Sequence, residues 1–379
     1  MNFDFSEDQK SLQDEVHRFL RDRCDLSAVR TVLDDPQLDY AESLWREMVD
    51  LGWTGIAIPE QYGGLGMGYL ELCVMAEEMG RFLAPVPFSS SLYLFAEAVL
   101  QSDSETLKQQ ILPQVATGDM IGTLAFAEGL GFPRSDSIKV RFENGQLCGE
   151  KWPVTDGMLA DTAVVLAVDE NDEPCLCLVN LNQQAVQRKG LESIDPTRNQ
   201  ALLKFSGAEA ECLAVAETET GLVSSSWLLF ERVLNGAAVL FAFEQIGGAD
   251  ACLTMACDFS QQRQAFGRPV GSFQAIKHKL ADIYVDNQLA RSNAYYGAMA
   301  LNADGNELPL AASVARVSGI RAFDNAASEN IQVHGGMGFT WEADCHLYLR
   351  RSRSLALQLG SSGLWKKQVG DELQRKYIG

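Results

Sequence analysis

The segment from Trp227 to Phe259 constrains the fold most, because it is apolar on almost every side of a helix. A helix of this kind cannot face water and must be buried by its neighbours. Further stretches of helical periodicity follow at Gln274–Leu301, Leu308–Val333 and Leu347–Val369. Long helices with short connections are typical of an antiparallel bundle. We therefore predict a C-terminal four-helix bundle over residues 221–379.

The middle of the chain has a different pattern. In Lys139–Glu150, Asn144-Gly145 lies between two runs in which apolar and polar residues alternate, and this pattern predicts a β-hairpin. Ala163–Val168 and Cys175–Asn180 are short apolar runs typical of strands. We predict a small β domain over residues 121–220.

The first 120 residues have helical spacing again and begin with a capping-box pattern at Ser6 and Gln9. The predicted fold class is therefore α+β, mostly α. It has an N-terminal helical domain (1–120), a central β domain (121–220) and a C-terminal bundle (221–379).

The net charge of −20, from 31 basic and 51 acidic residues, argues against binding to nucleic acid or to an anionic membrane. The N-terminus is acidic and polar, unlike a secretory signal. No uninterrupted apolar run reaches the ~18–20 residues of a membrane span. Nine scattered cysteines without a CxxC pattern predict reduced thiols in the cytoplasm, and four histidines without ligand spacing predict no metal site.

Three segments have a composition suited to a phosphorylated ligand, and each also has a plain structural reading. Pro59–Tyr69 holds four glycines, which suit a phosphate cradle or a tight turn before a helix. In Arg263–Pro269, Arg263 could bind a pyrophosphate with Phe266 packed beside it. Alternatively, Arg263 could cap the preceding helix and Phe266 could belong to the core. The glycines of Gln332–Phe339 suit a close ligand or a helix C-cap.

Taken together, these segments resemble the acyl-CoA dehydrogenase family over nearly the whole chain. The matching stretches are Gly52–Arg81, Arg263–Asp282 and Gln332–Arg351, in the family's order. The resemblance implies the three-domain fold above, with FAD bound between the β domain and the bundle at a dimer interface. It also implies a homodimer or homotetramer, or a heterotetramer with a homologous chain.

The resemblance also implies the cofactor site. One group matches positions that touch the FAD of the neighbouring subunit, and a second matches the loop around the adenine and phosphates. A third lies in the β domain beside the flavin. The first group is Arg263, Phe266 and Gln274, the second is Gln332, Gly335 and Gly336, and the third is Phe126, Ser135 and Thr155.

The β domain departs from the family at two places. Ala127 replaces the usual threonine, and the loop up to Asp136 is one residue longer. Pro153 stands where an aromatic residue usually lies beside the flavin ring. The first change affects an expected hydrogen bond to the flavin, and the second affects the expected packing of an aromatic side chain against the flavin ring.

The implied reaction is α,β-dehydrogenation of an acyl-CoA thioester, in which a carboxylate removes the α-proton and flavin N5 accepts a hydride. Electrons would then pass to an electron-transferring flavoprotein. The two family positions for the base are occupied by Leu359 and Ala237. Glu244, seven residues past Ala237 on the same helix face, is the replacement candidate, or else a paired structural carboxylate. Weaker candidates are Glu231, Glu342 and Asp344.

Three functions follow from these observations. The favoured one is an active acyl-CoA dehydrogenase of acyl-CoA or fatty-acid metabolism with a relocated base. The second is a catalytically silent subunit that completes the FAD site of a different chain. The third is a flavin oxidase or monooxygenase on the same fold.

Overall fold

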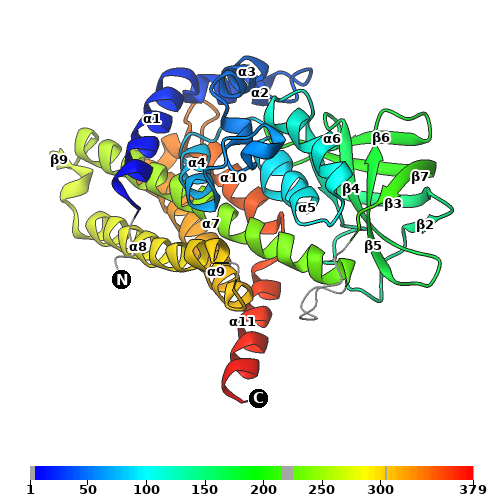
Figure 1. Ribbon diagram of the computed structural model, residues 1–379. Coiled ribbons are helices and arrows are strands. Elements are labelled where there is room, and N and C mark those ends of the chain that lie inside the picture. The colour runs from blue at the N-terminus through cyan, green and yellow to red at the C-terminus, as the bar shows by residue number, and fades with distance from the viewer. Residues whose placement is uncertain (1–4, 215–224, 304, 379) are drawn as a thin grey trace. The chain divides into compact units, whose positions relative to one another are not determined.

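The computed structural model describes residues 5–214, 225–303 and 305–378, and Figure 1 shows the path of the chain. The chain divides into two compact units. We refer to Met1–Thr31, Tyr69–Ala84 and Ala238–Gly379 as the helical unit. Val32–Gly68 and Pro85–Ala237 form the mixed unit. Both units take residues from the first 120 positions, and the domain boundaries at residues 120 and 220 remain predictions.

The helical unit contains the predicted C-terminal helices together with two N-terminal ones. In it α8 packs along α9, and α10 and α11 also pack against α9. Its helices are α1 (Glu7–Arg23), α4 (Tyr69–Arg81), most of α7 (Ser226–Gln262), α8 (Gln274–Asn302), α9 (Leu308–His334), α10 (Cys345–Leu357) and α11 (Ser362–Tyr377). The capping box at Ser6 is confirmed: its hydroxyl accepts from the Gln9 N–H, and the Gln9 side chain accepts from the Ser6 N–H.

Helix α7 belongs to the helical unit from Ala238 onward. By length and composition it is apolar enough to cross a membrane, with a window of mean hydropathy 1.3. However, 72% of that window is buried inside the protein, which is the pattern of a core helix. The predicted deep burial of this helix is therefore confirmed.

Two glycines bring α4 and α7 into backbone contact. A Cβ atom added at Gly80 would lie 1.8 Å from the carbonyl oxygen of Glu244. A Cβ atom added at Gly247 would lie 1.8 Å from the carbonyl oxygen of Glu77. No side chain fits at either position, because the neighbouring atoms belong to a helix backbone.

The mixed unit holds the predicted sheet and the remaining helices. Its strands are β1 (Gly122–Ala125), β2 (Arg141–Glu143), β3 (Gln146–Thr155), β4 (Thr162–Val168), β5 (Pro174–Asn180), β6 (Val186–Leu191) and β7 (Gln200–Cys212). Its helices are α3 (Glu42–Asp50), the π-helix η3 (Ser89–Ala96), α5 (Glu97–Leu100) and α6 (Glu105–Ala116), while α2 (Leu26–Asp34) contains a boundary between the units.

The sheet closes on itself. Strand β4 pairs with β1, β2 and β5, and β7 pairs with β3, β5 and β6, so the path β4-β2-β3-β7-β5 returns to β4. The predicted hairpin is confirmed: Glu143 pairs with Gln146, and Asn144 and Gly145 both have positive φ, at 51° and 76°. These are the angles of a type I′ turn, which joins twisted strands without splaying them. The α+β, mostly α fold class is thus confirmed.

Candidate functional site

The first candidate segment follows directly from the end of α7. Arg263 is exposed, and its carbonyl accepts from the Val270 N–H at 2.8 Å, which closes a short loop. Inside the loop, β8 (Gln264–Ala265) and β9 (Arg268–Pro269) form a small hairpin. Phe266 stands at its tip with 95% of its surface exposed. An aromatic residue this exposed is available to a ligand or a second subunit.

The second candidate segment ends α9. Gly335 has a φ of 59°, and its N–H donates to the carbonyl of Gln332, so the predicted C-cap is present. A Cβ added at Gly335 or Gly336 would meet no heavy atom within 4 Å. The backbone here is therefore open to a ligand as well as capping the helix. Gln332 is exposed on the last turn.

The structure brings these two segments together. Phe259, near the end of α7, stacks on His334 at the end of α9, with ring centroids 4.1 Å apart. Arg263 follows Phe259 by one helical turn, and Gly335 follows His334 directly. The C-terminal residues predicted to bind the cofactor therefore lie at one end of the helical unit.

The start of α8 belongs to the same end. Gln274 is the first residue of α8, is exposed, and its Nε2 lies 2.9 Å from Nε2 of His278. The amide groups at the N-terminus of a helix attract negative charge. With an exposed arginine fork and open glycine backbone beside it, this end suits an anionic group such as a diphosphate.

The β-domain residues lie in the mixed unit, where β1 and β3 run side by side. Thr123 donates through its hydroxyl to the carbonyl of Thr155 at 2.7 Å, which fixes the two strands. The Thr155 hydroxyl accepts from the Gln200 amide at 3.1 Å. Thr155 is 9% exposed, whereas Ser135 lies on an exposed loop.

Glu128 organises that loop. Its carboxylate accepts from the backbone N–H groups of Lys139 (2.8 Å) and Val140 (3.0 Å), and from Nζ of Lys151 at 2.7 Å. Burial lowers the pKa of Lys151 to about 8, and the Glu128 charge opposes this shift. The backbone hydrogen bonds join Glu128, at the start of the loop that carries Ser135, to Lys139 and Val140 at its end.

Phe126 sits in an aromatic cluster that the sequence did not predict. Its ring centroid lies 6.0 Å from Phe132 of the lengthened loop and 5.6 Å from Phe230 of α7. Trp227 extends the cluster, 5.4 Å from Phe230. Pro153 is exposed. Pattern reading missed Phe132 and Phe230, because their meeting depends on the path of a loop.

The two family positions of the catalytic base are buried and aliphatic. Ala237 and Leu359 are both 0% exposed, and neither side chain can accept a proton. The Leu359 carbonyl accepts from Nε1 of Trp365 at 3.1 Å. These two positions therefore offer no acid–base group.

Glu244, the replacement candidate, is also 0% exposed and lies among buried arginines. Its Oε1 is 3.7 Å from Nη1 of Arg351, whose Nη2 donates to the Leu83 carbonyl at 3.2 Å. Arg316 donates to Gln245 at 2.8 Å; burial lowers the pKa of its guanidinium, and the Glu244 charge raises it. The arrangement is that of a carboxylate compensating buried positive charge.

The weaker base candidates are at the surface or paired. Glu231 is exposed and accepts from Nε1 of Trp227 at 2.8 Å. Asp344 accepts from Nε of Arg30 at 2.7 Å, and Glu342 is exposed. None of these has the buried, ligand-facing environment that tunes a carboxylate as a base.

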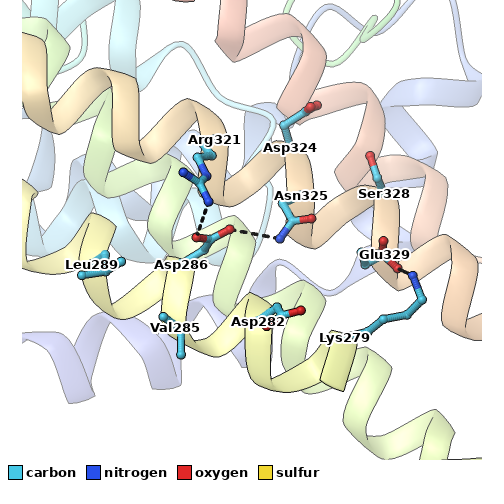
Figure 2. Close-up of a pocket in the computed structure, with 10 residues that line it drawn as sticks. All are labelled: Lys279, Asp282, Val285, Asp286, Leu289, Arg321, Asp324, Asn325, Ser328 and Glu329. Carbon is cyan, nitrogen blue, oxygen red and sulfur yellow. Dashed lines mark hydrogen bonds and ion pairs between the residues drawn. The ribbon is translucent and has the colours of Figure 1, made fainter. Parts of the chain in front are cut away.

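Two other features are distinct from these residues. In the Pro59–Tyr69 segment, the N–H groups of Leu65, Gly66 and Met67 bond to carbonyls of Gly55, Ile58 and Ile56, so the tight turn is the better reading. A groove of about 820 Å³ lies between α8 and α9, and the Lys279–Glu329 ion pair, 2.5 Å long, is in its wall. Figure 2 shows the charged side chains that line it. None of the nine expected cofactor residues is among the described residues that line it.

Comparison with known proteins gives consistent matches. Residues 6–119 match the model "Acyl-CoA dehydrogenase, N-terminal domain", and residues 227–374 match "Acyl-CoA dehydrogenase, C-terminal domain". The chain is 30% identical to acyl-CoA dehydrogenase IpdE2 of Mycobacterium tuberculosis over 356 residues, which is 94% of each protein.

Solved structures show the same similarity. One is the Tcur3481-Tcur3483 steroid ACAD G363A variant, with a TM-score of 0.87, 26% identity and coverage of 98% of this chain and 99% of that one. Another, a glutaryl-CoA dehydrogenase from Mycobacterium smegmatis in complex with FADH2, has a TM-score of 0.85. It is 21% identical, covers 97% of this chain and 95% of its own, and shows the fold.

Proposed function

Because the chain belongs to the acyl-CoA dehydrogenase family, we propose that it binds FAD and takes part in α,β-dehydrogenation of an acyl-CoA thioester. Electrons then pass to an electron-transferring flavoprotein. The observation that carries the proposal is the end of the helical unit where Arg263 and the Gly335–Gly336 backbone meet through the Phe259–His334 stack.

The residues at this end fit the adenosine diphosphate part of FAD. Arg263 would hold the phosphates, the bare backbone of Gly335 and Gly336 admits a close ligand, and Phe266 offers an exposed ring. In the mixed unit, Thr155 and Ser135 carry hydroxyl groups of the kind that bind a flavin. Bound flavin supplies the hydride acceptor. The chain's own residues would bind the FAD and orient its flavin.

Exposed apolar side chains support a subunit contact. On α8, Val285 and Leu289, four positions apart and therefore on one face, are 53% and 59% exposed. Apolar groups that gather on one helix face are typical of interfaces. We propose a homo-oligomer or a heterotetramer with a homologous chain. We also propose that it works in the cytoplasm, which nine free thiols support.

A second function is favoured by the missing base: a subunit that completes the flavin site of a homologous, active chain. Ala237 and Leu359 supply no carboxylate, and Glu244 compensates buried arginines. One solved relative also bears the names of two proteins, Tcur3481 and Tcur3483. On this proposal, the α-proton is removed by a carboxylate of the partner.

Anaerobic titration with a panel of acyl-CoA thioesters tests both functions. We expect the chain purified alone to show no flavin bleaching, because neither base position can accept a proton. We expect a co-expressed hetero-oligomer with a homologous chain to be yellow and to bleach.

The other outcomes are equally informative. Bleaching by the chain alone would establish an independent enzyme with a relocated base and overturn the silent-subunit proposal. No bleaching in either preparation, with rapid oxygen consumption by chemically reduced flavin, would favour an oxidase or monooxygenase instead.

Replacing Arg263 tests the diphosphate site. Arg263→Ala should weaken FAD binding to the oligomer by about 10- to 100-fold, since a charge-assisted hydrogen bond contributes ~1.5–3 kcal/mol. Release of flavin fluorescence on dilution measures the dissociation constant. Lys366→Ala, which removes an exposed cation on α11, is the matched control. Equal affinities of the two variants would rule out Arg263 as a phosphate ligand.

A further inference from the structure

Three cysteines meet in the sheet of the mixed unit. Cys175 and Cys177 lie on β5, two positions apart and therefore on the same face, with their Sγ atoms 3.7 Å apart. Cys212 is the last residue of β7 and pairs directly with Cys177. None of the three belongs to the cofactor residues discussed above.

The register of β5 and β7 gives the Cys177–Cys212 pair the geometry of a disulfide site. The strands are antiparallel, and the Leu213 N–H donates to the Leu176 carbonyl at 2.7 Å. Leu176 and Leu213 are thus the hydrogen-bonded pair, so the next pair, Cys177 and Cys212, is non-hydrogen-bonded. In such pairs the Cα atoms are about 4.5 Å apart, within the roughly 4.4–6.8 Å that a disulfide spans.

Cys175 is less well placed for the same bond. It is the diagonal neighbour of Cys212, and diagonal Cα atoms across a sheet are about 7–8 Å apart. A disulfide between them would require the backbone to move. Cys175 instead contacts the Cys177 thiol on its own strand.

Burial and charge give the three thiols different roles. Cys212 is exposed, whereas Cys175 is 5% and Cys177 0% exposed. The neighbouring thiols of Cys175 and Cys177 hold the pKa of Cys212 below its usual range, while burial and Asp169 oppose the shift. The hydrogen bonds to Cys175 and Cys212, with burial, raise the pKa of Cys177. One exposed thiol thus lies beside a buried one.

We propose that Cys212 and Cys177 form a reversible oxidation site for peroxides. The Cys212 thiolate attacks one peroxide oxygen, the O–O bond breaks, and the products are a sulfenic acid and hydroxide. The Cys177 sulfur then attacks Cys212, the S–O bond breaks, and water leaves with the thiol proton as the disulfide forms. Two thiol sulfurs are oxidised and one peroxide is reduced, and a dithiol reductant restores both thiols.

A metal site is the competing reading of clustered thiols. Within the described residues, however, no group of three His, Cys, Asp or Glu side chains is arranged to hold a metal ion. Disulfide formation needs only the pair that the register already places opposite each other.

Peptide mapping of the purified full-length protein, in its native oligomer, tests the proposal. After treatment with hydrogen peroxide and capping with N-ethylmaleimide, we expect a Cys177–Cys212 cross-linked peptide that dithiothreitol removes. Cys177→Ser should stop the reaction at a Cys212 sulfenic acid that dimedone traps. Cys175→Ser should retain the cross-link, as should Cys148→Ser, which removes an exposed cysteine on β3.

A rate of cysteine alkylation, measured on the protein without substitutions, tests the proposal even if the variants fold poorly. In the unmodified protein, iodoacetamide should modify Cys212 faster than Cys177, because Cys212 is exposed and Cys177 is buried. A cross-link to Cys175, or peroxide that consumes Cys148 while Cys177 and Cys212 stay capped as free thiols, would overturn the proposal. So would modification of Cys177 by iodoacetamide as fast as that of Cys212.

Discussion

Gly80→Ala is expected to lower the free energy of unfolding by about 3 kcal/mol or more, the upper end of overpacking effects. The new methyl carbon would lie 1.8 Å from the Glu244 carbonyl oxygen on α7. Neither helix can yield locally, because the clash is between backbone-attached atoms rather than flexible side-chain ends. Urea denaturation followed by circular dichroism measures the free energy of unfolding. Failure of the variant to accumulate as folded protein would also agree with the predicted destabilisation.

Gly247→Ala should have a similar effect, since its methyl carbon would lie 1.8 Å from the Glu77 carbonyl oxygen on α4. Gly370→Ala is the matched control. Gly370 lies in the exposed face of α11, and an added Cβ there meets no heavy atom within 4 Å. That change should stabilise the protein by ~0.5–1 kcal/mol through helix propensity. Equal stability of all three variants would contradict the backbone contact between α4 and α7.

Local patterns were sufficient for the features that depend on neighbouring residues. The apolar run of α7, the Asn144-Gly145 turn and the Ser6 capping box each need only a few adjacent positions to be recognised. The Gly335 C-cap belongs to the same class. Residue spacing along the chain encodes them directly, because 3.6-residue and 2-residue periods and turn angles are local properties.

Contacts between distant segments were beyond the same reasoning. Gly80 and Gly247 look like ordinary helix glycines until α4 lies on α7. The N-terminal helices are shared between two units, which periodicity within each helix cannot reveal. Likewise, the Phe259–His334 stack, which brings together the two loops proposed to bind the cofactor, joins residues that are far apart in the sequence.

The candidate base shows this difference most clearly. Helical geometry placed Glu244 on the same face as Ala237, which made it a plausible replacement. Its electrostatic surroundings come from Arg316 on α9 and Arg351 on α10, far away in the sequence. Only the packing of three helices shows that this carboxylate already has charged partners.

Glu244→Gln is therefore expected to act on stability. Removing one partner of a buried ion pair costs ~3–5 kcal/mol, because the remaining charge stays buried without compensation. Here Arg351 at 3.7 Å would lose its carboxylate, and Arg316 would lose the charge that supports its protonated form. Urea denaturation of the variant measures the effect. Glu342→Gln, which neutralises an exposed carboxylate after the glycine loop, should change stability by less than ~0.5 kcal/mol.

The same variant separates a structural carboxylate from a catalytic one. In the flavin-loaded oligomer, Glu244→Gln that still folds should bleach with acyl-CoA at nearly the original rate, because the α-proton is removed elsewhere. A general base contributes about 10²–10⁴-fold to rate, so its loss is easily detected. Unchanged stability together with a bleaching rate lower by that factor would identify Glu244 as the base, and the chain would then be an enzyme in its own right.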